Sequence, residues 1–276
     1  AVGLRVARNP LELKGALFIS GNIPIIAVEF ARASRMLRYL FIAVIAVFGA
    51  AEVTAAEKLH LEGIRGKDDR QLERTQAFPW SAIGRVNTRT GGFCTGTLIG
   101  PSTVLTAAHC FWNKRTRRWL DPRSMHYLAA YSLSNYLAES KVKSYRLSDP
   151  NLSNLAAIHN DYTKDWAIME LEKPVGDTVG YLPMIALTGH EIAQAGYSKD
   201  KPHVLTINHK CRVQGRRERM LFHDCDATYG DSGSPILVRD GERIGVGAVN
   251  VAVGSSKTDP NKSVGIAITL PEGAVK

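Results

Sequence analysis

The chain from residue 77 onward is a succession of short apolar runs, each bounded by Gly, Asn, Asp or Pro. A first set includes AIGRV, GTLIG, TVLTAA and WAIMEL, and a second set includes EIAQAGY, SPILV and SVGIAITL. Short runs with turn residues at close spacing predict β-strands and an all-β barrel or sandwich. Between the two sets, residues 172–187 contain two prolines and two glycines, which predicts a crossing between two domains.

Residues 228–235 read TYGDSGSP, a stretch with two possible interpretations. Gly, Asp, Ser and Pro are common turn residues, so the stretch could be a surface turn. It could also be a tight loop that presents Ser232 as a nucleophile, with glycines that let backbone N–H groups face a carbonyl oxygen. The second interpretation requires a base and a carboxylate elsewhere in the chain.

Two upstream segments supply these groups. TVLTAAHC ends near His109, and DYTKDWAIMEL contains Asp165 immediately before an alternating apolar run. Asp165 could instead simply cap a strand end, and Asp161, four residues earlier, competes with it for the role of the carboxylate. The order along the chain is therefore His, Asp, Ser. An α/β-hydrolase esterase is disfavoured, since its order is Ser, acid, His and its helices alternate with strands.

The segments CTGTLIG, LTAAHC and HDCDATYGDSGSPIL resemble the trypsin-like serine proteases, with wording closest to the bacterial V8-like branch. The resemblance covers about Asp69 to Pro271. It implies two antiparallel six-stranded β-barrels with a catalytic triad between them. His109 would be the general base, Asp165 would hold its tautomer, and Ser232 would attack the scissile carbonyl. The N–H groups of Gly230 and Ser232 would form the oxyanion hole.

The resemblance also implies a substrate pocket, which we assign to Asp226, Asn250 and Gly265. Asp226 lies six residues before Ser232, where a carboxylate at the pocket floor selects Arg or Lys, and Gly265 would keep the pocket open. Asn250 lies on the strand that follows the predicted Asp240-Gly241 hairpin turn. Asp226 could instead face solvent. V8-like cleavage after Glu usually employs a histidine beyond the nucleophile, and this chain has none after His223. A preference for Arg or Lys is therefore predicted over one for Glu.

The chain contains four cysteines. The family resemblance implies a Cys94–Cys110 disulfide beside His109. Cys211 and Cys225 remain for each other, as a bridge across a hairpin or as two buried free thiols. The cysteine and histidine spacings match no zinc motif, so we predict neither a metal nor another cofactor.

Residues 35–56 have the basic start, short apolar core and small residues of a secretory signal. The core is shorter than the roughly 20 residues that span a bilayer, so no stable anchor is expected after cleavage. The predicted organisation is as follows: an upstream extension (1–35), a signal peptide (36–56), a propeptide or arm (57–76), a first barrel with the crossing (77–187) and a second barrel (188–276). The protein would be secreted or periplasmic.

A formal net charge of +9 does not indicate nucleic-acid binding. The basic run KRTRR at 114–118 is interpreted as a solvated hairpin loop. The predicted partner is a protein or peptide substrate, and the rival hypothesis is a protease-like binding protein without turnover. Asp231 would accept either a newly cleaved chain terminus or a local hydrogen bond. Three basic residues of the arm offer processing points: Lys67, Arg70 and Arg74.

Overall fold

The computed structural model describes residues 61–255 and 263–275. The predicted upstream extension, the signal peptide and the first four residues of the predicted arm lie outside the described residues. No helix within the described ranges is long and apolar enough to cross a bilayer.

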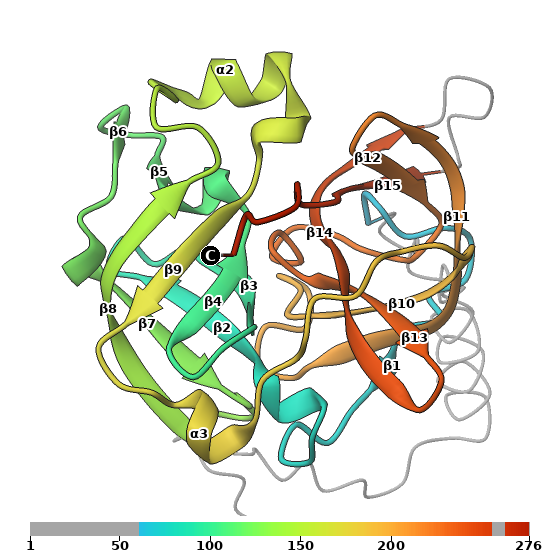
Figure 1. The fold of residues 1–276 in the computed structure, drawn as a ribbon, viewed down its shortest axis with the longest axis horizontal. Helices are drawn as coiled ribbons and strands as arrows, with labels where there is room; N and C mark the ends of the chain where they lie inside the picture. The colour runs from blue at the N-terminus through green and yellow to red at the C-terminus, as the bar shows by residue number, and fades with distance from the viewer. Residues whose placement is uncertain (1–60, 256–262, 276) are drawn as a thin grey trace, which may run out of the picture. The chain divides into compact units, whose positions relative to one another are not determined.

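Six antiparallel strands close into the first barrel in the order β2-β3-β4-β9-β8-β7 (Figure 1). Their bounds are β2 (Ile83–Thr88), β3 (Phe93–Leu98), β4 (Thr103–Thr106), β7 (Met125–Ala129), β8 (Ala138–Leu147) and β9 (Ala167–Leu171). Along these strands, alternate side chains point into the barrel and are buried, among them those of Val104, Tyr127 and Met169. The apolar alternation seen in the sequence therefore lines the barrel core.

The second barrel is built from the strands that follow the crossing. Their bounds are β10 (Glu191–Gly196), β11 (Thr206–Arg217), β12 (Met220–His223), β13 (Pro235–Asp240), β14 (Arg243–Ser255) and β15 (Ser263–Ile268). They pair in the order β11-β10-β13-β14-β15-β12, and a β11–β12 pairing closes the ring. β13 and β14 form the hairpin predicted from Asp240-Gly241, with Asp240 opposite Arg243. The prediction of two six-stranded barrels is confirmed.

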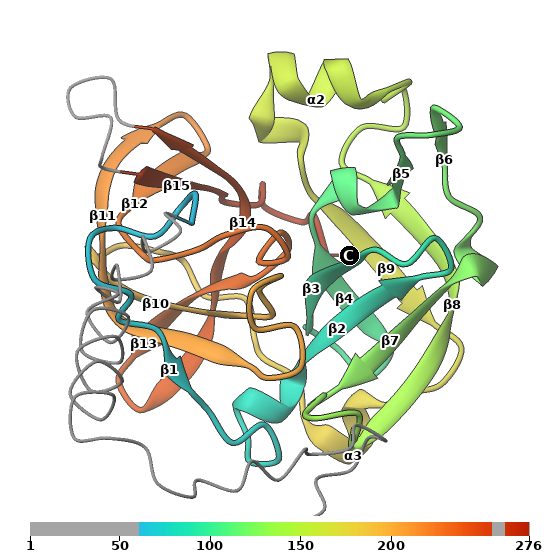
Figure 2. The same cartoon turned by 180° about the vertical axis from the view of Figure 1, so that it is seen from behind.

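The described part of the N-terminal arm, residues 61–76, runs along the second barrel before the chain enters the first (Figure 2). Its short strand β1 (Gln71–Leu72) pairs with β11, with Gln71 opposite Ile207. The arm thus adds a seventh strand to the second sheet. This attachment brings residues 61–70 close to the site described below.

Short elements connect the strands. They are the 3-10 helices η1 (Trp80–Ala82), η2 (Ala108–Phe111), η3 (Pro122–Ser124) and η4 (Tyr162–Lys164), the α-helices α2 (Leu155–Asn160) and α3 (Gly176–Val179), and the strands β5 (Trp112–Asn113) and β6 (Arg118–Trp119). β5 and β6 form a hairpin, and residues 114–118 at its tip are exposed, as predicted for the basic run. The strand pattern did not predict α2, whose N-terminus is capped by the side chain of Asn154.

Both predicted disulfides are formed. Cys94 of β3 is bonded to Cys110 of η2, and Cys211 of β11 is bonded to Cys225, which follows β12. The described residues contain no free cysteine. Each bridge therefore fixes a segment next to one of the predicted catalytic residues: η2 in the first barrel and the approach to Ser232 in the second.

The two barrels are joined by hydrogen bonds around Thr95 of β3. The Thr95 N–H donates to the carbonyl of Ser232 (2.9 Å), and the Tyr197 N–H donates to the Thr95 hydroxyl (2.9 Å). Tyr197 also donates its hydroxyl hydrogen to the carbonyl of Tyr131 (2.9 Å). These bonds fix the serine turn of the second barrel against a strand of the first.

Candidate active site

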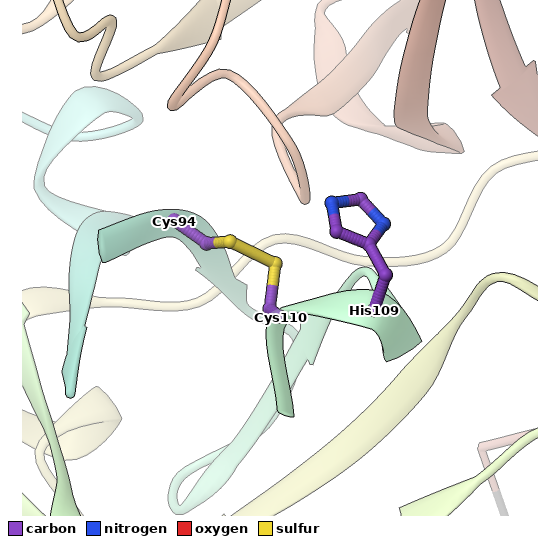
Figure 3. Close-up of side chains that lie close together, drawn as sticks. All are labelled: Cys94, His109 and Cys110. Carbon is purple, nitrogen blue, oxygen red and sulfur yellow. A yellow bond between two sulfur atoms is a disulfide. The ribbon is translucent and has the colours of Figure 1, made fainter. Parts of the chain in front are cut away.

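His109 lies in η2, directly after β4 of the first barrel. The disulfide between Cys94 and Cys110 holds this turn against β3, and the imidazole leaves the turn beside the disulfide (Figure 3). The sulfur atoms of both cysteines lie close to the imidazole, as in a metal site. They are bonded to each other, however, so this cluster offers no thiolate ligand.

Asp165 lies between η4 and β9, and its carboxylate contacts His109 twice. Oδ1 accepts a hydrogen bond from the backbone N–H of His109 (2.9 Å), and Oδ2 lies 2.7 Å from Nδ1 of the ring. The residue is only 1% exposed. Asp161, the competing aspartate, instead caps η4, where its Oδ1 accepts from the backbone N–H and the hydroxyl of Thr163. One buried carboxylate thus fixes both the backbone and the ring of His109.

The electrostatics of the His109 ring follow from this contact. Burial disfavours the charged imidazolium, but the charge and hydrogen bond of Asp165 outweigh burial, so the pKa of His109 is raised above 6.5. Lys114 opposes this rise with its positive charge. The ring is therefore poised to take up a proton near neutral pH.

Ser232 lies in a turn between Gly230 and Gly233, both with positive φ (99° and 85°). The Ser232 carbonyl accepts from Thr95, and the Gly233 N–H donates to the carbonyl of Asn250 (2.7 Å). A Cβ at Gly233 would lie 2.1 Å from the Thr95 carbonyl oxygen, so only glycine fits this turn. The turn brings Ser232 to a pocket that His109 also lines.

The peptide bond between Tyr229 and Gly230 has a defined orientation. The Tyr229 carbonyl accepts a hydrogen bond from the backbone N–H of Lys199 (2.6 Å). Because a trans peptide directs its C=O and N–H to opposite sides, the Gly230 N–H points away from Lys199. Gly230 also lines a second pocket that Ser232 and His109 share. The Lys199 bond therefore fixes the orientation of the Tyr229–Gly230 peptide beside Ser232.

Asp231 is buried (1% exposed) beneath this loop. Its Oδ2 accepts hydrogen bonds from the Ser198 hydroxyl (2.7 Å) and from the Thr228 N–H (2.9 Å). Burial raises the pKa of the Asp231 carboxyl, while these bonds and the positive charge of Arg70 act in the opposite direction. Among the described residues, the contacts of this carboxylate are local side-chain and backbone groups.

Asp226 lies at the N-terminal arm. Its Oδ1 accepts from the Arg65 N–H (2.7 Å) and its Oδ2 from the Asp69 N–H (3.1 Å), and the residue is 2% exposed. Burial raises the pKa of Asp226 against these two bonds. Asp226 is not among the residues that line the pocket of Ser232. The position argues against the predicted role of selecting Arg or Lys, since both oxygens are used within the chain.

Asn250 and Gly265 meet at a third residue, His223 of β12. The Asn250 Oδ1 lies 3.0 Å from the His223 Nε2, and the Asn250 amide donates to the Asp231 carbonyl (3.2 Å). A Cβ at Gly265 would lie 2.0 Å from the His223 ring, so this glycine makes room for the imidazole. Burial lowers the pKa of His223 to about 4. Asn250 lines the pocket of Ser232, whereas Gly265 is not among its lining residues.

Four residues around this site were not predicted from the sequence to take part in it: Glu62, Arg70, Ser198 and Lys199. Glu62 lines the pocket, and its Oε2 accepts from the Tyr229 hydroxyl (2.7 Å). Arg70, which was predicted as a processing point, is buried, with 1% of its side chain exposed. No local motif marks these residues, because their partners lie far away in the sequence.

Two closed antiparallel barrels, with a His–Asp pair on the first and a glycine-flanked serine turn on the second, define the chymotrypsin-fold class. The family model described as Trypsin matches residues 69–271. The chain therefore belongs to this trypsin-like serine protease family.

Relatives and solved structures agree with this assignment. Glutamyl endopeptidase of Bacillus licheniformis is 29% identical over 188 residues, which cover 66% of this chain and 57% of the relative. Serine protease 23 of Bos taurus is 31% identical, with 59% of this chain and 47% of the relative covered. The chain thus spans about half the length of these curated relatives.

The solved structure titled "Structure of Glu endopeptidase in complex with MPD" has a TM-score of 0.64 at 22% identity. The match covers 77% of this chain and 95% of the chain in that solved structure. The protease Anisep from Arthrobacter nicotinovorans has a TM-score of 0.56 at 19% identity. This match covers 72% of this chain and 93% of the Anisep chain. At these identities, both show the shared fold.

Proposed function

We propose that this chain is a serine endopeptidase that cleaves peptide bonds through an acyl-enzyme on Ser232. The observation that carries the proposal is a single pocket lined by His109, Asp165 and Ser232, in which Asp165 contacts Nδ1 of His109 at 2.7 Å. The contact leaves Nε2 as the ring nitrogen that can serve the serine hydroxyl. The two disulfides support export to an oxidising compartment, as the sequence predicts.

The reaction follows from these groups. The Ser232 hydroxyl attacks the scissile carbonyl while its proton passes to Nε2 of His109. The carbonyl oxygen, now negative, accepts hydrogen bonds from the N–H groups of Gly230 and Ser232. His109 then gives its proton to the leaving amine, and the C–N bond breaks. Water, deprotonated by His109, releases the acyl group in a second passage through the same steps.

Hydrolysis of a mixed set of internally quenched peptides tests the proposal. We expect turnover by the protein in its mature, exported form, and loss of turnover in Ser232→Ala. Ser234→Ala is a matched control, because Ser234 is a buried neighbour in the same turn. A folded protein without turnover, or a Ser232→Ala variant with full turnover, would refute the proposed activity.

For the residue before the cleaved bond we propose glutamate instead of Arg or Lys. Asp226 does not line the pocket, since both of its oxygens accept hydrogen bonds from the arm, and the lining Asp165 is held by His109. The Tyr229 hydroxyl donates to the Glu62 carboxylate at an exposed part of the pocket lining, and the same hydroxyl would be a donor for a substrate carboxylate. Lys114 adds a positive charge to the lining. The name of the Bacillus licheniformis relative supports the same preference.

Three peptides that differ only at this position, with Glu, Gln or Lys, separate the two preferences. We expect the highest kcat/KM for Glu, with Gln much lower because it lacks the charge. Asp226→Asn should leave this order unchanged. Faster cleavage after Lys, lost in Asp226→Asn, would restore the prediction made from the sequence.

A protease-like binding protein is the second candidate, because Glu62 of the chain's own arm lines the pocket and contacts Tyr229 there. The variant Glu62→Ala removes this side chain and the acceptor of the Tyr229 hydroxyl. If Glu62 only competes with substrate, KM falls and kcat stays. Absence of turnover in both forms of a folded protein would favour the binding protein.

A further inference from the structure

We propose that Arg70 is a positioning residue that holds residues 229–232, here called the oxyanion loop, in their active orientation. The proposal rests on the proposed endopeptidase function and adds a residue of the N-terminal arm to it. Arg70 lies in the arm just before β1 and acts through Ser198 and Asp200, two residues of the loop after β10.

The guanidinium of Arg70 is fully hydrogen-bonded. Nη1 donates to the Ser198 hydroxyl (2.8 Å) and to Asp200 Oδ1 (3.2 Å), and Nη2 donates to Asp200 Oδ2 (2.7 Å). Nε and Nη2 donate to the two carboxylate oxygens of Asp68, both at 2.9 Å. These bonds use all five N–H donors of an arginine, in a side chain that is 1% exposed. A lysine could not reproduce this geometry.

These contacts lie on both sides of Lys199. Ser198 links Arg70 to Asp231, since its hydroxyl accepts a hydrogen bond from Arg70 and donates one to Asp231 Oδ2 (2.7 Å). Lys199, between Ser198 and Asp200, donates its backbone N–H to the Tyr229 carbonyl. Arg70 therefore fixes the segment that orients the Tyr229–Gly230 peptide. If this segment moves, the Gly230 N–H is no longer held toward the scissile carbonyl.

Charge adds to the same effect. Asp231 is a buried carboxylate one residue before the nucleophile, and a buried charge without compensation is costly. Burial raises the pKa of Asp231, and the nearby positive charge of Arg70, which Asp68 and Asp200 share, acts in the opposite direction together with the Ser198 hydrogen bond. In this arrangement the positive charge near Asp231 comes from Arg70, a side chain within the arm. The oxyanion loop would then be ordered without the amino group of a newly cleaved chain terminus.

The arrangement has a consequence for processing. Cleavage before Asp68 would leave the Arg70 contacts in place, because β1 anchors the arm to β11 just beyond. Cleavage after Arg70 would separate this side chain from β1. The active protein is therefore expected to retain residues 68–72.

The test compares Arg70→Ala and Arg70→Lys with wild type on one peptide substrate. Loss of the guanidinium should lower kcat about 100-fold, as expected when an oxyanion donor is lost, with little change in KM. Arg70→Lys should remain impaired. The acid limb of the pH profile of kcat should keep the apparent pKa of wild type, because the His109–Asp165 pair is unchanged in these variants.

Guanidinium ion, added below the concentration that unfolds the protein, should restore part of kcat in Arg70→Ala. Arg74→Ala, a control at an exposed residue of the same arm, should keep the wild-type kcat and should not gain activity from guanidinium. Restored kcat cannot come from a merely loosened arm.

If Arg70→Ala does not fold, Ser198→Ala decides, since it removes only the hydroxyl between Arg70 and Asp231. A lower kcat in folded Ser198→Ala supports the proposal. Wild-type kcat in folded Arg70→Ala or Ser198→Ala overturns it, as does an effect on KM alone. Failure of the proposed function looks different, because wild type itself would then show no turnover.

Discussion

The substitution Asp165→Asn tests the His–Asp contact most sharply, because the structure fixes how an asparagine would sit. The carboxylate Oδ1 accepts from the His109 backbone N–H at 2.9 Å, so the oxygen of an asparagine must stay there. Its NH₂ group then faces Nδ1 of the ring, at the position that Oδ2 occupies at 2.7 Å. An NH₂ donor requires an unprotonated Nδ1, so the proton moves to Nε2. In that tautomer His109 cannot accept the proton of Ser232.

The wrong tautomer removes general-base catalysis and leaves the binding and oxyanion contacts. We expect kcat to fall by about 10⁴-fold, which is about 5 kcal/mol of transition-state stabilisation. Turnover of a fluorogenic peptide at saturation measures kcat, and thermal unfolding checks that the variant is folded. Asp161→Asn is the matched control, because an asparagine oxygen can keep both bonds to Thr163. A folded Asp165→Asn variant with kcat within tenfold of wild type would show that Asp165 does not set the His109 tautomer.

Three further predictions concern pH and the disulfide. The kcat/KM profile should rise with pH through an apparent pKa above 6.5, because the active base is neutral and the pKa of His109 is raised; a midpoint below 6.5 contradicts this. The folded-state pKa of His223 is lowered to about 4, so its contribution to stability is complete above pH 6.5 and is lost as the pH falls toward 4. Wild type should lose about 3 kcal/mol more unfolding free energy over this range than His223→Gln, measured by urea denaturation. Replacing Cys94 and Cys110 by alanine opens a loop with a sequence separation of 16 residues, which should cost about 3 kcal/mol and lower Tm. An unchanged Tm would show that the bridge does not stabilise the fold.

The barrels were predictable because their signal is local. Period-two apolar runs and turn residues mark each strand, and the Asp240-Gly241 turn marks the β13–β14 hairpin. His109, Asp165 and Ser232 were found for a similar reason, since each lies in a short segment with a distinctive sequence. The helix α2 was missed because its six residues lack a helical apolar period long enough to recognise.

The contacts of the arm could not be predicted, because no local pattern encodes them. Arg70 and Ser198 are 128 positions apart, and Arg65 and Asp226 are 161 apart. At sequence level, Arg70 is one basic residue among several in a charged segment. Asp226 has the spacing of a pocket carboxylate, yet its surroundings are decided by an arm that the spacing does not reveal. Long-range partners of this kind become visible only once the barrels are assembled.

In the proposed mechanism, His109 of the first barrel activates Ser232 of the second. Labelling with a fluorophosphonate probe, followed by mass mapping of the modified peptide, reports this activation without any substrate. We expect one adduct on Ser232, no adduct in Ser232→Ala, and much slower labelling in His109→Ala. A folded wild-type protein that is not labelled would contradict this mechanism. Labelling of His109→Ala as fast as that of wild type would contradict it too.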